Sequence, residues 1–226
     1  MLVFAWMVIV VLIVSIVHAM GLTALALFAA VRIEEVGIGI GPLLGAISVG
    51  NVKVGLHAFP LGSFLKTAAF DPRDPAAHIT TFSRIHPLRR AGVMLGGCLA
   101  VYALALVCLG PERAWDSFRE VYSAAVQGAV LSVGENVDVM TRVDGFIRGH
   151  TMLETMGVLT TVVLVFNLLP IPGLPGGNLL IEFVSLVRPI TAGVREKLLV
   201  GGFVVNVFIV VGWAYGLVRY ALRGTG

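Results

Sequence analysis

Long uncharged apolar runs alternate with shorter polar segments along this chain. The runs cover residues 2–31, 91–109, 155–169 and 198–218. The first run would extend about 45 Å as a helix, which is enough to cross a hydrocarbon core about 30 Å thick and to continue beyond it. The third run is short, and we expect it to start near Met152 with Glu154 at the interface. The pattern predicts an α-helical polytopic membrane protein with about four spans, at about 2–31, 91–109, 152–169 and 198–218.

The N-terminal run has a second interpretation as a cleaved signal peptide. Such a peptide carries a Lys or Arg before its apolar stretch, and the first basic residue here is Arg32. We therefore expect the run to remain as a membrane span.

A cluster of helix-breaking residues follows the third run. Residues 167–178 contain three prolines and three glycines, so a helix should end here. A break at membrane depth leaves backbone N–H and C=O groups unpaired, which hydrocarbon tolerates only where the segment packs in protein or lines a polar cavity. The sequence therefore predicts a Pro/Gly-broken segment at this place.

The segment between the first two spans has the pattern of a β-rich hairpin. Glycine is too frequent in residues 36–42 for a stable helix, and residues 52–56 alternate as a strand does. We expect a β-rich region over 36–68, with a turn at 60–66 and a polar connector over 70–90. An ordinary cytoplasmic hairpin is the alternative interpretation.

The loop at 110–151 carries apolar residues at helical spacing. The spacing predicts an amphipathic helix at the outer membrane interface, and packing against the spans explains the same pattern equally well. The residues are Trp115, Phe118, Val121, Tyr122, Ala125 and Val126.

Composition and charge agree with a membrane protein. Apolar residues make up 58% of the 226 residues and charged residues 13%, and the mean hydropathy is +0.95. The net charge of +3 does not indicate nucleic-acid binding, because the basic residues are dispersed and lack interleaved aromatics. Cys98 and Cys108 lie within one predicted helix, about 15 Å apart, too far for a disulfide.

Basic residues are distributed unevenly between the loops. Segments 32–90 and 181–197 hold ten Lys and Arg, whereas 110–151 holds four beside six acidic residues. Since cytoplasmic loops are rich in Lys and Arg, we expect segments 32–90 and 181–197 in the cytoplasm. Both termini and the 110–151 loop are then outside.

Two motifs resemble those of the site-2 protease family of intramembrane zinc metalloproteases. Residues 167–178, NLLPIPGLPGGN, resemble the pattern N-x-x-P-x-P-x-L-D-G-G-H, and residues 18–22, HAMGL, align with H-E-x-x-H. Residues 39–42, GIGP, match a downstream G-x-G-P at the same distance. Two motifs in the right order predict the family fold as one domain over 1–226. The 110–151 loop is too short for the PDZ domain that many relatives insert there.

The resemblance also identifies which catalytic positions are altered. In the family, two histidines and the aspartate bind zinc, and the glutamate between the histidines activates a water molecule. Only His18 retains a ligand at these positions, because Ala19 replaces the glutamate, Leu22 the second histidine and Pro175 the aspartate. We therefore expect no catalytic residues and no zinc cofactor, with His18 a vestigial ligand.

The favoured function is a noncatalytic, pseudoprotease-like membrane protein. It would bind a transmembrane segment or scaffold a membrane complex, with the lipid bilayer and another membrane protein as partners and no nucleic acid. The alternatives are an active protease with relocated ligands, for which Glu182 is the candidate, and a subunit of a transport or channel assembly. The residues expected to shape the partner cleft are Gly39, Gly41, Pro42, Val52, Val54, Leu56, Asn167, Pro170 and Pro172.

Overall fold

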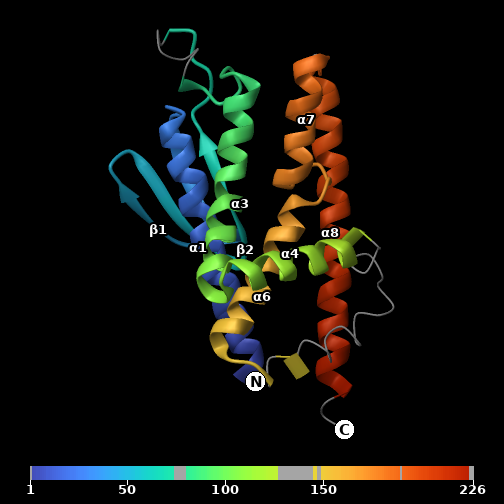
Figure 1. Cartoon of the computed structure of the whole chain (residues 1–226). Helices are drawn as coiled ribbons and strands as arrows, with labels where there is room; N and C mark the ends of the chain where they lie inside the picture. Colours follow the sequence, from blue (N-terminus) through green and yellow to red (C-terminus); the bar gives the residue numbers. More distant parts are fainter. Residues whose placement is uncertain (1, 74–79, 127–144, 147–148, 189, 224–226) are drawn as a thin grey trace. The chain divides into compact units, whose positions relative to one another are not determined.

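Each predicted apolar run lies in a helix of the computed structural model (Figure 1), which describes residues 2–73, 80–126, 145–146, 149–188 and 190–223. The chain is mostly helical, with one antiparallel sheet. The helices are α1 (Leu2–Phe28), α3 (Pro87–Leu109), α4 (Pro111–Val126), α6 (Met152–Leu168), α7 (Pro175–Val187) and α8 (Ala192–Arg223), and the strands are β1 (Ile33–Val49) and β2 (Val52–Thr67).

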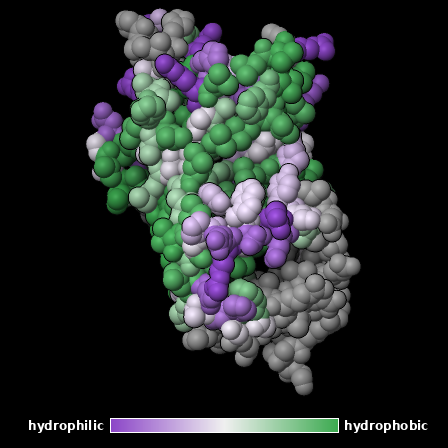
Figure 2. All heavy atoms as spheres, viewed as in Figure 1, coloured by the Kyte–Doolittle hydropathy of each residue, from purple (hydrophilic) through white to green (hydrophobic). Residues whose placement is uncertain are grey.

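Two of the described helices are long and apolar enough to cross a membrane. They are Trp6–Phe28 within α1 and Pro87–Leu109, while α6 and α7 are shorter apolar helices. Large hydrophobic side chains are exposed on α1, α7 and α8, and hydrophobic residues form much of the face in Figure 2. A lipid environment accounts for such exposure better than water does. The count of four spans stays a prediction.

The chain divides into two compact units. The first comprises Met1–Leu104 with Asn178–Ile190, and the second Ala105–Gly177 with Thr191–Gly226. Each unit is described by itself.

The β-rich prediction for residues 36–68 is confirmed by β1 and β2, which form an antiparallel pair. Glu35 lies opposite both Lys53 and Lys66, and Ile38 lies opposite both Leu56 and Ser63. The first part of β1 is therefore flanked on both sides by parts of β2. The chain reverses direction between Leu56 and Ser63, because the two parts of β2 run past the same part of β1 in opposite senses. The predicted turn at 60–66 is therefore confirmed in part: Gly62, with a φ of 78°, lies in the reversal, whereas residues 63–66 pair with β1.

In the first unit, α1 packs on the sheet and on α3 (Figure 1). A Cβ on Gly96 would lie 2.5 Å from the carbonyl oxygen of Gly21, and a Cβ on Gly21 would collide with Gly96 in turn. The two backbones thus touch, as small residues allow between membrane helices. Gly92, four positions earlier on α3, has open space around it. Ala19 on α1 and Val93 on α3 join a core with residues of the sheet.

In the second unit, α4 packs against α6. Phe118, Val121 and Ala125 cluster with Val165 and Leu169, so the apolar stripe of α4 packs on a helix. Trp115 and Tyr122, from the same predicted stripe, remain exposed. Gly157 lets α6 approach the end of α3, because its missing Cβ would collide with Leu109.

The backbone contact at Gly96 should tolerate no side chain. Gly96→Val should lower the apparent Tm of the detergent-purified protein by roughly 5 °C, since overpacking costs about 1–3 kcal/mol. Gly92→Val is the matched control on the same helix and should leave the Tm within about 1 °C. Equal shifts in the two variants would mean that the α1–α3 crossing is not the constraint, and thermal unfolding followed by size-exclusion chromatography measures both.

Candidate functional site

His18 is buried on α1 and is held by the sheet and by α3. Its Nδ1 lies 2.7 Å from Oγ of Ser63 on β2. A Cβ on Gly97 would overlap the Nε2 edge of the ring, so the imidazole packs directly on the α3 backbone. Nε2 itself is buried and has no hydrogen-bond partner among the described residues. The retained family histidine thus lies between two structural elements.

A second polar contact lies one turn earlier on α1. Gly62 N donates to Oγ of Ser15 at 3.1 Å, and the Ser15 hydroxyl also donates to Val11 O at 2.8 Å. Ser15 and His18 lie three positions apart on one helix face. Their hydrogen bonds connect Gly62 and Ser63, two consecutive residues of β2, to α1, the helix that carries the HAMGL motif.

Apolar side chains occupy the two neighbouring motif positions. Ala19 is buried in the core of the first unit with Val36 and Val93, and Leu22 is half-buried. Neither side chain has an atom that can bind a metal or move a proton.

Pro175 has a structural role where the family has an aspartate. It is the first residue of α7, a position that proline favours because its fixed φ suits the helix and its missing N–H is not needed there. Gly176 and Gly177 follow, and a Cβ on either would collide with the backbone of Leu168 or Ile171. The predicted break is confirmed, since α6 ends at Leu168 and α7 begins at Pro175.

Glu182, the candidate for a relocated ligand, forms a buried ion pair. Its side chain is 1% exposed, and its Oε2 lies 2.6 Å from Nη2 of Arg90 and accepts from Nε at 2.8 Å. Arg90 also donates from Nη1 to Ser83 O at 2.9 Å. The Glu182 carboxylate is therefore paired with the Arg90 guanidinium, and this ion pair links the start of α3 to α7.

Glu154 also has a structural role. It closes a capping box with Thr151 at the start of α6 and lies 3.0 Å from Arg113. Across the described residues, no group of three or more His, Cys, Asp and Glu is placed to hold a metal ion. Because a catalytic zinc usually has three protein ligands, the donor set around His18 does not fit that ion.

The first six predicted cleft residues lie in the sheet of the first unit. Gly39 and Gly41 have φ values of 85° and 93°, and Cβ atoms there would collide with Phe59. His57 Nδ1 donates to Gly41 O at 2.8 Å and fixes this segment. The other four residues differ in exposure: Val52 and Val54 pack on the core, and Pro42 and Leu56 are exposed.

The remaining predicted cleft residues lie in the second unit. Asn167 donates from Nδ2 to Val163 O at 2.8 Å, so its side-chain amide is hydrogen-bonded within α6. Pro170 and Pro172 line a groove beside α8.

Sequence reasoning missed an exposed apolar strand in β1. Residues 43–49 pair with one side of β2, and no other described strand covers their far side. Leu44 is 67% exposed and Ile47 66%. The apolar, glycine-containing character of residues 43–49 could be read from the sequence. The chain reversal that places this segment at the edge of the sheet could not. Ser63 and Gly97 were missed because their link to His18 arises from tertiary packing.

Comparisons with known proteins agree with the two motifs. The sequence model described as Peptidase family M50 matches residues 6–209. A Clostridium perfringens protein named "putative zinc metalloprotease" is 28% identical over 132 residues, which are 57% of this chain and 39% of that protein. The chain thus spans about two fifths of the length of the curated relative it matches.

The Arg90–Glu182 pair should show strong energetic coupling. Glu182→Leu or Arg90→Leu alone should destabilise the protein by about 3–5 kcal/mol, because each leaves an uncompensated buried charge. The double variant should recover most of that loss. A double-mutant cycle by denaturant unfolding measures the coupling, and additive losses would show that the pair is not buried as described.

Proposed function

This chain belongs to peptidase family M50, the site-2 protease family, and we propose that it is a noncatalytic, pseudoprotease-like member. In this proposal it binds a segment of another membrane protein and holds it without cleaving it. A scaffold role in a larger complex would involve the same binding of a membrane segment, with a partner that stays bound.

The lack of companion ligands beside His18 in the described part of the chain carries the proposal. A catalytic ligand needs a free nitrogen directed at the metal and companions that share it. His18 Nδ1 faces Ser63, and its Nε2 is buried against Gly97 without a hydrogen-bond partner among the described residues, but Ala19 and Leu22 supply no second donor that could share a metal ion with it. Pro175 and the two glycines after it are explained by the local fold alone.

The exposed edge of β1 supports binding. An edge strand offers a row of unpaired N–H and C=O groups that another chain can pair with. In hydrocarbon each unsatisfied group costs several kcal/mol, so the strand at 43–49 favours an extended partner segment. Leu44 and Ile47 on that strand would provide side-chain contacts.

The proposal includes a multi-pass arrangement in the membrane. The helices α1, α3, α6 and α8 supply the four spans, with both termini outside. Segments 32–90 and 181–197 are then cytoplasmic, which follows from the excess of Lys and Arg there.

Metal analysis tests the loss of catalysis. The protein purified in detergent should carry far less than one zinc per chain. If the unaltered protein contains about one zinc per chain that is lost in His18→Ala and kept in His57→Ala, the chain has a metal site and the proposal is wrong. Elemental analysis by mass spectrometry provides the measurement.

Photo-crosslinking tests the binding edge. Photoreactive residues at positions 44 and 47 should capture one discrete membrane protein, because these side chains stand on the uncovered strand. Val211 on α8 is the control, since it is 58% exposed and apolar but lies on a helix. The same set of bulk proteins captured at all three positions would remove the support for a partner at this edge.

Cysteine labelling tests the orientation. In a background of Cys98→Ala and Cys108→Ala, an impermeant maleimide on intact cells should label Glu120→Cys in α4 and spare Ser83→Cys. Both introduced cysteines stand at exposed positions, so accessibility depends on the side of the membrane. Labelling at position 83 alone would reverse the topology.

A further inference from the structure

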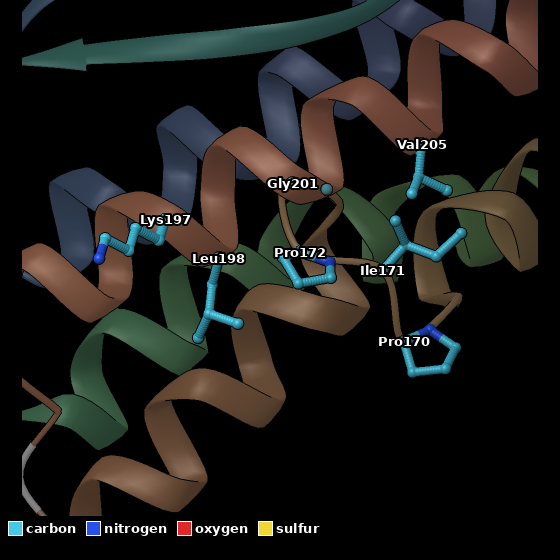
Figure 3. A pocket seen from close by; sticks show the side chains of 8 residues that line it. Pro170, Ile171, Pro172, Lys197, Leu198, Gly201 and Val205 are labelled. Atoms are coloured by element: carbon cyan, nitrogen blue, oxygen red, sulfur yellow. The ribbon is translucent and has the colours of Figure 1, made fainter.

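An apolar groove in the second unit runs along α8 beside the helix break (Figure 3). This open groove has a volume of about 400 Å³, at the small end of the range for ligand sites. Its lining residues are Pro170, Ile171, Pro172, Lys197, Leu198, Gly201, Gly202 and Val205.

Two neighbouring glycines shape this groove in opposite ways. A Cβ on Gly202 would overlap the carbonyl of Pro172, so α8 and the break are in direct contact there. A Cβ on Gly201 would meet nothing within 4 Å. The space beside Gly201 is therefore part of the groove, and a larger side chain at position 201 would occupy it.

The chemistry of the lining changes along its length. Lys197, Gly201 and Val205 recur every four residues on one face of α8, over about 12 Å of helix. Lys197 is the one charged side chain in the lining, and Figure 3 places it at the opposite end from Val205. The groove thus combines an apolar channel with a cationic end.

We propose that this groove binds one anionic phospholipid, with an acyl chain beside Gly201 and the phosphate at the Lys197 ammonium. A lysine can lay its aliphatic stem along apolar surface while its charge reaches the headgroup level. Lys197 ends a segment assigned to the cytoplasmic side, where the leaflet is rich in anionic lipids. The inference rests on the membrane arrangement proposed above.

The lining favours a hydrocarbon chain over a protein segment. An extended peptide in the membrane needs hydrogen-bond partners for its backbone. Apart from Lys197, no side chain in this lining can donate or accept a hydrogen bond, and the Pro172 carbonyl is covered by Gly202. Arg195 and Glu196 precede Lys197 on α8 but are not part of the lining.

Native mass spectrometry of the full chain in detergent tests the proposal, with dioleoyl phosphatidylglycerol and dioleoyl phosphatidylcholine added at equal concentration. The unaltered protein should retain one phosphatidylglycerol at least fivefold more often than phosphatidylcholine. Gly201→Leu should abolish this retention, because leucine fills the groove. Gly193→Leu is the matched control on the same helix: position 193 also has open space, lies outside the lining, and should bind lipid as the unaltered protein does.

A second pair of variants tests the headgroup contact. Lys197→Gln should remove the preference for phosphatidylglycerol, and Lys197→Arg should keep it. Equal retention by the unaltered protein and Gly201→Leu would overturn the proposal, as would a preference that survives Lys197→Gln. A co-purifying protein displaced by Gly201→Leu, with no lipid bound, would assign the groove to a protein segment instead. Zinc content and capture at positions 44 and 47 report on the proposed function separately, so the two ideas can fail independently.

Discussion

The close crossing of α1 and α3 is the contact on which the first unit depends. Because Gly21 and Gly96 bring the two backbones together, the neighbouring Gly97 forms one wall of the space around His18. The sheet then covers the other side of α1 through Ser63 and Gly62. In lipid, apolar burial between helices gains little, so such packing and a few polar contacts supply most of the association energy.

Residues of the two family motifs also have structural roles in this chain. His18 is retained where it fills a space between a helix and a strand, and Pro175 is suited to beginning a helix. The glycines after Pro175 remain necessary because the backbone of the helix break lies against them. Packing and helix geometry therefore account for these motif residues without reference to a metal ion.

Local patterns were sufficient to predict the elements but insufficient to predict their contacts. The apolar runs, the Pro/Gly break and the β-rich region were all visible, because each depends on residues close together in the sequence. The turn at 60–66 was predicted too long, because residues 63–66 pair with β1 and the extent of such pairing is decided by tertiary partners. The pairing of Glu182 with Arg90 joins distant segments that no local pattern connects, and the same holds for His18 with Ser63.

The ion pair between Arg90 and Glu182 also sets an order of events during biosynthesis. The two residues are 92 positions apart, and the first unit is completed only by residues 178–190. At translation rates of roughly 5–20 residues per second, Arg90 is made about 5–18 s before its partner carboxylate exists. During that interval the guanidinium needs water, lipid phosphate or an assembly factor as a temporary counterpart. The first unit thus cannot be complete before residue 190 has been synthesised.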